Sequence, residues 1–154
     1  MVGKDSKMNK PQKQTFADIT AKFVGKPYSE YGKGPDSYGC LGLCYAFLKE
    51  LGKTIDESVW QYQDLTMDNF IEPWRENPKR LERILIEASN RLGAEVPVNE
   101  KLAGDFVIVQ SRIKGYFPGI YVGNSHVMAS YADMGVRVFQ IDNEGITIIK
   151  VRRL

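Results

Sequence analysis

Cys40 is the residue of this sequence best placed for nucleophilic chemistry, because it lies where a loop gives way to a helix. The turn-forming residues Pro35-Asp36-Ser37 and then Gly39 precede it. Beyond Cys40, apolar residues recur every three or four positions as far as Leu51, which predicts a helix with one buried face, and Gly52 predicts its C-terminal cap. Backbone N–H groups and the helix dipole in a first turn favour a thiolate and could stabilise an oxyanion. A buried structural cysteine is the competing interpretation.

The other residues capable of chemistry are few. His126 is the single histidine and the one side chain whose ordinary pKa suits a base near neutral pH. Cys40 and Cys44 lie one helical turn apart, which is a poor geometry for a disulfide, and with the distant His126 they make a poor metal site. No zinc signature, phosphate-binding glycine loop or paired carboxylates occur, so we predict no metal and no cofactor.

Length and composition indicate one globular domain. The chain has 154 residues, of which 43% are hydrophobic and 26% charged, and its net charge of +2 is too small to predict a nucleic-acid partner. Several lysines gather at the start, so we expect a flexible basic tail over residues 1–14 and a single domain over residues 15–154. No signal peptide and no membrane-spanning run is evident, and the two cysteines favour a reducing compartment.

Helical patterns come first and strand patterns follow. We predict helices over residues 15–25, from Cys40 to Leu51 and over residues 78–92, and an irregular aromatic segment over residues 53–77. After Pro97 the sequence predicts about five strands, at residues 105–110, 116–122, 126–132, 136–141 and 146–152. Gly123-Asn124 and residues 142–145 carry hairpin turn signals. This order predicts an α+β fold.

Three motifs occur in the order in which one enzyme family has them. Residues 23–28 match the family's G-x-P-Y, residues 38–43 match its D-C-S-G-L turn, and residues 102–107 with 119–124 match its P-G-D-L-V and H-V-G-I-Y-x-G-N strands. Over residues 16–150 the chain therefore resembles the NlpC-type family of papain-like cysteine peptidases, which cut peptidoglycan stem peptides. The resemblance implies a papain-like α+β domain, with N-terminal helices packed on an antiparallel sheet, and a stem peptide or a similar peptide as partner.

The resemblance extends to particular members of the family. The aromatic insertion after the cysteine helix, and Tyr-Gly-Cys in place of Asp-Cys-Ser, look more like phage and prophage versions than like secreted hydrolases. This implies a location in the cytoplasm or in a phage particle.

The sequence departs from the family pattern at the partners of the nucleophile. The chemistry needs a base and a residue that orients the base. The position of the base is Phe117, followed by Pro118, and the position of the orienting residue is Met128. Apolar surroundings raise the pKa of a thiol, so we expect Cys40 to be poorly activated.

His126 is the one histidine that could replace the missing base. If Gly123-Asn124 is a two-residue turn, Tyr121 lies opposite His126, and Phe117 lies four residues further along the same face. At ~3.3 Å per residue this separates His126 from the Phe117 position by about 13 Å, far beyond the reach of a hydrogen bond. His126 therefore remains a secondary candidate for the base.

These observations lead to one hypothesis and two alternatives. We expect a catalytically impaired NlpC-like domain that serves as a binding or structural module for peptidoglycan peptides, with Cys40 in a cleft lined by Tyr28, Tyr38, Phe117 and Met128. The first alternative is an active cell-wall cysteine peptidase or amidase with Cys40 as nucleophile and a non-standard base. The second is an acyl-transfer or thiol-modification site on the same scaffold.

Overall fold

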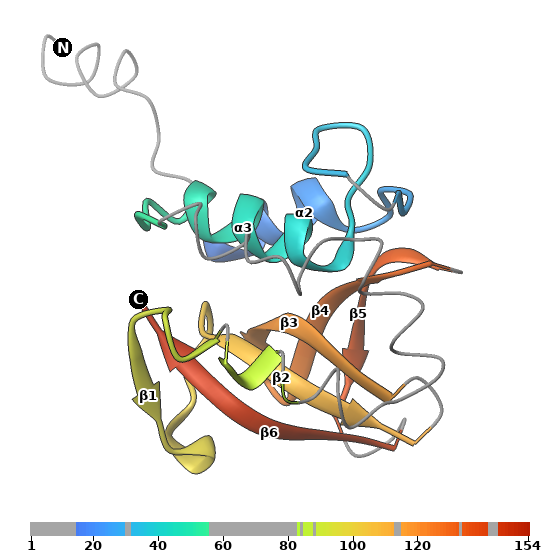
Figure 1. The fold of residues 1–154 in the computed structure, drawn as a ribbon. Helices are drawn as coiled ribbons and strands as arrows, with labels where there is room; N and C mark the ends of the chain where they lie inside the picture. The colour runs from blue at the N-terminus through green and yellow to red at the C-terminus, as the bar shows by residue number, and fades with distance from the viewer. Residues whose placement is uncertain are drawn as a thin grey trace, which may run out of the picture.

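The computed structural model describes residues 15–29, 32–55, 83, 85–87, 89–112, 115–132, 134–141 and 145–154. In these residues two helices, α2 and α3, lie over one face of a six-stranded antiparallel sheet (Figure 1), which confirms the α+β prediction. The expected tail, residues 1–14, and nearly all of the segment expected over residues 53–77 lie outside the described residues. So does the start of the helix expected over residues 78–92, of which residues 83, 85–87 and 89 are helical.

Helix α2 spans Phe16–Phe23, within the range predicted from the sequence. Thr15 begins it with a capping box, in which its hydroxyl accepts from the amide of Asp18 at 3.1 Å and the Asp18 carboxylate accepts from the Thr15 amide at 3.2 Å. Two of the four N–H groups that a helix start leaves unpaired are thereby satisfied. Ile19 and Phe23 form the buried side of the helix.

Helix α3 spans Cys40–Glu50 and begins at the predicted cysteine. Gly52 follows the C-cap of this helix, and its φ of +81° is the left-handed conformation that glycine adopts readily. The amide of Lys53 donates to the carbonyl of Leu48 and that of Gly52 to the carbonyl of Lys49, both at 3.0 Å. These two bonds form a Schellman motif, so the sequence located both ends of this helix correctly.

All five predicted strands are present, with bounds within a few residues of those expected. A sixth, β1, spans Ala94–Val96 and was not predicted, because three residues carry too little alternation to be recognised. A 3₁₀ turn, η3, follows at Val98–Glu100. The remaining strands are β2 (Phe106–Ser111), β3 (Gly115–Gly123), β4 (His126–Tyr131), β5 (Gly135–Gln140) and β6 (Ile146–Arg153).

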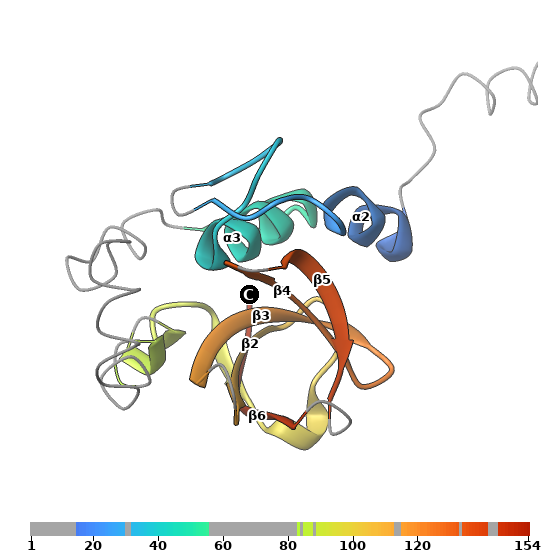
Figure 2. The same cartoon turned by 90° about the vertical axis from the view of Figure 1, so that its right-hand side faces the viewer.

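The sheet order is β1-β6-β2-β3-β4-β5, which corrects one prediction. Residues 142–145 were expected to join β5 and β6 as a hairpin, but β6 pairs with β1 and β2, while β5 pairs with β4 at the opposite edge. Figure 2 shows the reason, since the sheet curls until its strands almost close a ring. In a curled sheet, strands that are distant in pairing order can be joined by a short connection.

A second correction concerns the turn between β3 and β4. Gly123 pairs with His126, and Tyr121 pairs with Val127, with a register shift between them. The turn residues are therefore Asn124 and Ser125, with φ of 50° and 61°, rather than Gly123-Asn124. Two successive left-handed residues match the twist of a hairpin, and asparagine tolerates this conformation better than most residues.

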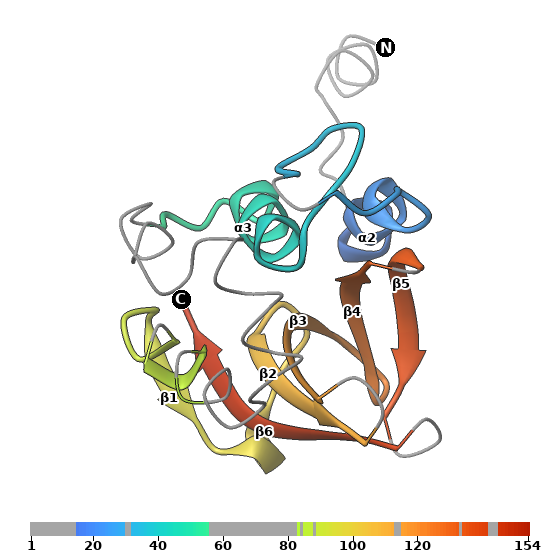
Figure 3. The ribbon, with the colours of Figure 1, turned by 45° about the vertical axis from the view of Figure 1, so that its right-hand side comes forward.

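The curled sheet separates two apolar clusters. The first lies between the sheet and the helices and contains Cys40, Phe47, Ile120 and Met128 among its members. The second lies on the other face of the strands, where Val109, Phe117, Val127, Phe139 and Ile148 are buried. Figure 3 shows α2 and α3 on the same side of the sheet, so a β residue reaches the cysteine helix only if its side chain faces the side of the first cluster.

Candidate functional site

The Cys40 thiol is held in the first turn of α3, among the side chains of the first cluster. It is a free cysteine with 9% of its surface exposed. Burial raises the pKa of this thiol from 9.0 to about 12, and hydrogen bonds with the backbone of Leu41 and of Cys40 itself lower it by less. The favourable effect of the helix start is thus present, but desolvation outweighs it.

Tyr38 fixes the chain two residues before the thiol. Its amide donates to the carbonyl of Pro27 at 3.0 Å, and its own carbonyl accepts from the hydroxyl of Ser130 at 2.7 Å and from the amide of Ser29 at 3.4 Å. Its ring packs against Phe23 with centroids 5.2 Å apart. Tyr38 therefore belongs to the buried framework that holds Cys40, and its phenol pKa is raised, chiefly by burial.

Two further residues named from the sequence lie on the same side of the sheet as Cys40. Met128, on β4, is fully buried in the first cluster. Tyr28 is half-buried and forms an isolated parallel bridge with Tyr38. The structure thus brings Met128 and Tyr38 into the cluster of Cys40 and joins Tyr28 to it through the backbone.

Phe117 does not lie beside Cys40, contrary to the expectation that it lines a shared cleft. Its ring belongs to the second cluster, 4.8 Å from the ring of Tyr131 and 5.7 Å from that of Phe139, measured between centroids. Because side chains alternate along a strand, the neighbours of Phe117 at Tyr116 and Pro118 take the helix-facing side.

His126 is half-exposed at the start of β4. Its Nδ1 lies 2.6 Å from the carbonyl oxygen of Asn124, at the hairpin turn. Alternation along β4 gives His126 the same facing as Met128, two residues or about 7 Å further along the strand. It was expected to share a face with Phe117, and the observed register separates the two.

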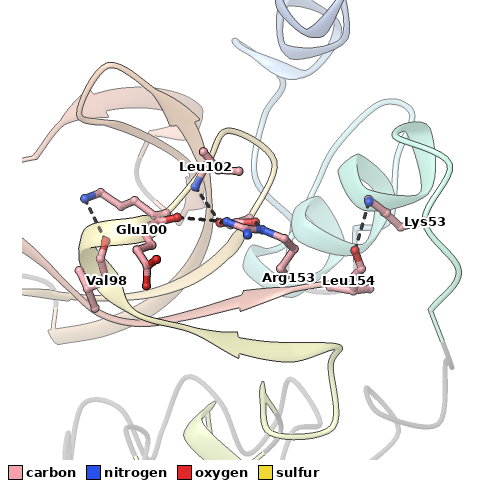
Figure 4. Close-up of polar contacts among 8 residues, drawn as sticks. Lys53, Val98, Glu100, Leu102, Arg153 and Leu154 are labelled. Carbon is pink, nitrogen blue, oxygen red and sulfur yellow. Dashed lines mark hydrogen bonds and ion pairs between the residues drawn. The ribbon is translucent and has the colours of Figure 1, made fainter.

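Asp105 has a structural environment. Its carboxylate is buried and accepts from Arg153 at both oxygens, from Nε at 2.9 Å and from Nη2 at 2.8 Å. The amide of Leu102 donates to the same carboxylate at 2.8 Å, and Arg153 also donates to the carbonyl of Glu100 at 3.2 Å (Figure 4). This carboxylate therefore ties the end of β6 to the turn that begins β2 and has no geometry suited to catalysis.

The sequence interpretation did not single out Ser130 or Arg153. Ser130 is a small polar residue on the helix-facing side of β4, and the alternation of β4 is the one signal that could have placed it there. Arg153 carried no signal, because its partner Asp105 lies 48 residues away in the sequence.

Across the described ranges, no group of three or more histidine, cysteine, aspartate or glutamate side chains is placed to hold a metal ion. None of the helices in these ranges combines the length and apolar character needed to span a bilayer. What the site offers is a thiol at a helix start, surrounded by apolar and aromatic side chains.

Comparison with known proteins agrees with the observed fold. A family model described as the NlpC/P60 family matches residues 25–152. Among solved structures, the chain is similar to NlpC1 from Trichomonas vaginalis, with a TM-score of 0.59 and 17% identity over 90% of this chain. It is also similar to the NlpC/p60 domain of the peptidoglycan hydrolase SagA, with a TM-score of 0.55 and 18% identity, covering 90% of this chain and 96% of that one.

A third similar structure is an NlpC/P60 family protein from Bacillus cereus, with a TM-score of 0.55 and 18% identity over 94% of this chain. The chain spans less than half of several of these relatives: 42% of NlpC1, 44% of NlpC2 from Trichomonas vaginalis and 42% of the Bacillus cereus protein. No relative was found among curated protein sequences.

Proposed function

The chain belongs to the NlpC/P60 family, and from that premise we propose that it is a module that binds peptidoglycan stem peptides and is impaired as a hydrolase. The observation that carries the proposal is the state of Cys40, whose thiol pKa is raised to about 12 by burial. Met128 is among the hydrophobic side chains that are buried together with it. A thiol protonated at neutral pH is a weak nucleophile.

The position of the histidine supports the same conclusion. A general base contributes a factor on the order of 10² to 10⁴ to a rate, provided that it lies within hydrogen-bond reach of the proton it removes. His126 lies at the hairpin end of β4 with its Nδ1 against Asn124. Phe117, which the sequence motif aligns with the family's base, packs in the second cluster away from Cys40. The peptide ligand is proposed from the family and from the structural neighbour described as a peptidoglycan hydrolase.

An active cysteine peptidase or amidase is the second candidate. It is favoured by the backbone hydrogen bonds of Cys40 and Leu41, which lower the pKa of the thiol. In that case a substrate or a movement of the chain would have to bring a base such as His126 to Cys40.

The proposal includes the domain layout and origin expected from the sequence. We propose that residues 15–154 form one domain preceded by a basic tail, and that the module derives from a phage or prophage. The origin is based on Tyr38-Gly39-Cys40 and on the insertion that follows α3.

Two assays with purified peptidoglycan test the function. Isolated stem peptides are titrated into the protein by calorimetry, and peptide release from peptidoglycan is followed by chromatography and mass spectrometry. Cys40→Ala is compared with Cys44→Ala, which makes the same change one turn further along α3.

We expect stem peptides to bind to the wild type and to both variants, without detectable release. Release that Cys40→Ala abolishes and Cys44→Ala retains would overturn the impaired state and establish the second candidate. A protein that binds no stem peptide and releases none would contradict both.

A further inference from the structure

Strands β3 and β4 pair only near their hairpin. Their register runs from Gly123↔His126 to Ile120↔Met128 and stops there. Beyond that point β3 continues to pair with β2 as far as Gly115, and β4 continues to pair with β5 as far as Tyr131. The first half of β3 and the second half of β4, all of it described, stay side by side, since the rings of Phe117 and Tyr131 are 4.8 Å apart, but their backbones are not paired. This interruption of the pairing is the opening in the ladder.

Pro118 supplies the physical reason for this opening. The amide of Tyr121 donates to the carbonyl of Asp105 on the β2 side, and alternation then directs the backbone of Ile120 and of Pro118 toward β4. Counting from Ile120↔Met128, the next pair that would exchange hydrogen bonds is Pro118 with Ser130, two residues further along each strand. Proline has no N–H to donate, so the ladder loses a bond at that step.

Ser130 uses its side chain at this opening. It is 2% exposed, and its hydroxyl donates to the carbonyl of Tyr38 at 2.7 Å, across 92 residues of sequence. Tyr38 is separated from Cys40 by Gly39 alone, and Gly39 begins α3 without a side-chain cap. The hydroxyl thus connects β4 to the backbone that leads directly into the first turn of the cysteine helix.

We propose that Ser130 is a positioning residue for Cys40. By fixing the Tyr38 carbonyl where the pairing of β3 and β4 ends, it holds the first turn of α3 against the sheet and keeps the thiol buried. The inference goes beyond peptide binding, because it concerns access to the thiol and needs no ligand for its test.

Cys44 provides an internal reference in the same helix. It is 0% exposed, and the pKa of its thiol is raised by burial, as that of Cys40 is. Loss of the Ser130 bond loosens the start of α3, although Pro27 and Ser29 still hold the backbone of Tyr38, and it exposes Cys40 first. Exposure of Cys44 requires the helix to leave the sheet or the domain to unfold, so the ratio of the two labelling rates separates a local effect from a global one.

The experiment measures iodoacetamide labelling of the two cysteines by peptide mass spectrometry. In Ser130→Ala we expect the rate at Cys40 to rise about five- to tenfold, and the rate at Cys44 to rise no more than global unfolding requires. At a factor of ten per 1.4 kcal/mol, this corresponds to ~1 to 1.4 kcal/mol, the range of a net hydrogen bond.

Ser89→Ala is the matched control. Ser89 is 1% exposed, and its hydroxyl also donates to a backbone carbonyl, that of Ile86, at 2.7 Å. Ser89→Ala loses the same kind of hydrogen bond at a place outside the contact between β4 and Tyr38. The labelling rates of Cys40 and Cys44 should therefore change by the same factor in this variant.

A second pair of variants tests the proposal in a different packing. Ser130→Thr keeps the hydroxyl, and Ser130→Val has nearly the shape of threonine without it. We expect Cys40 in Ser130→Val to label about five- to tenfold faster than in Ser130→Thr. Equal Cys40 rates in these two variants, or equal acceleration of Cys40 and Cys44 in Ser130→Ala, would overturn the positioning role.

Discussion

The sharpest consequence of the structure is a pH profile for the alkylation of Cys40. Burial raises the pKa of this thiol from 9.0 to about 12. At pH 7.5 a thiol with the ordinary value is about 3% ionised, and one with the raised value is about 0.003% ionised. Because the thiolate is the nucleophile, its lower population slows Cys40, and the greater nucleophilicity of a more basic thiolate offsets part of this effect. Cys40 should therefore react about 30- to 60-fold more slowly than an ordinary thiol, even before its restricted access is considered.

The measurement uses the Cys44→Ala variant, in which Cys40 is the one remaining thiol. Iodoacetamide labelling is followed from pH 7 to pH 10.5, with N-acetylcysteine as a free-thiol reference and the denatured protein as an internal one. We expect the rate constant of the folded protein to rise through the whole range without a plateau. The denatured chain and the reference should level off near their ordinary pKa.

One result would refute the reasoning. A plateau of the folded protein below pH 9, with a rate above that of N-acetylcysteine at pH 7.5, would mean that the helix start or an unrecognised base outweighs desolvation. The second candidate function would then be favoured, and the apolar environment of Cys40 would not control its chemistry.

Three further predictions follow from the contacts of single residues. Phe117→His should not create peptide-release activity in the same peptidoglycan assay, because the side chain at this position faces the second cluster. The lost packing should lower the free energy of unfolding by about 1 to 3 kcal/mol in urea melts. Peptide release that depends on the new histidine would show that this side chain faces Cys40 instead. Asp105→Asn should lower the free energy of unfolding by about 1.5 to 3 kcal/mol, because the hydrogen bonds from Arg153 and Leu102 lose their charged acceptor. A decrease in the free energy of unfolding below about 0.5 kcal/mol in the same melts would contradict this prediction. Because the pKa of Cys40 is raised in the folded protein, the unfolded chain loses this proton first as the pH rises. The free energy of unfolding should therefore fall from about pH 9 toward pH 12, and this thiol alone should account for a loss of about 1.4 kcal/mol at pH 10. Cys40→Ala should show a shallower fall, and an identical pH dependence in the two proteins would exclude this contribution.

Much of the fold could be predicted because its signals are local. The helix at Thr15 and the helix at Cys40 are defined by residues within a few positions of their ends, where the capping box and the left-handed Gly52 operate. The α+β class followed from apolar spacing in the same way. The short strand β1 escaped prediction because its stability comes from pairing with β6, more than fifty residues away.

The candidate site shows the same division. The sequence alone identified Cys40 at a helix start and Met128 on a neighbouring strand, and the structure gathers both in one cluster. It misplaced Phe117, because a one-residue difference in strand register reverses the facing of every side chain, and local sequence does not fix that register.

The sequence by itself located α2, α3 and five of the six strands of the sheet to within a few residues, and it determined which residue types stand at the family's motif positions. The tertiary structure alone decided which strands are neighbours, which face each side chain takes, and that the hydroxyl of Ser130 meets the carbonyl of Tyr38. The physical reason is range. Caps and periodicity act within about one helical turn, whereas sheet order, burial and the pKa of a buried thiol depend on groups brought together from opposite ends of the chain.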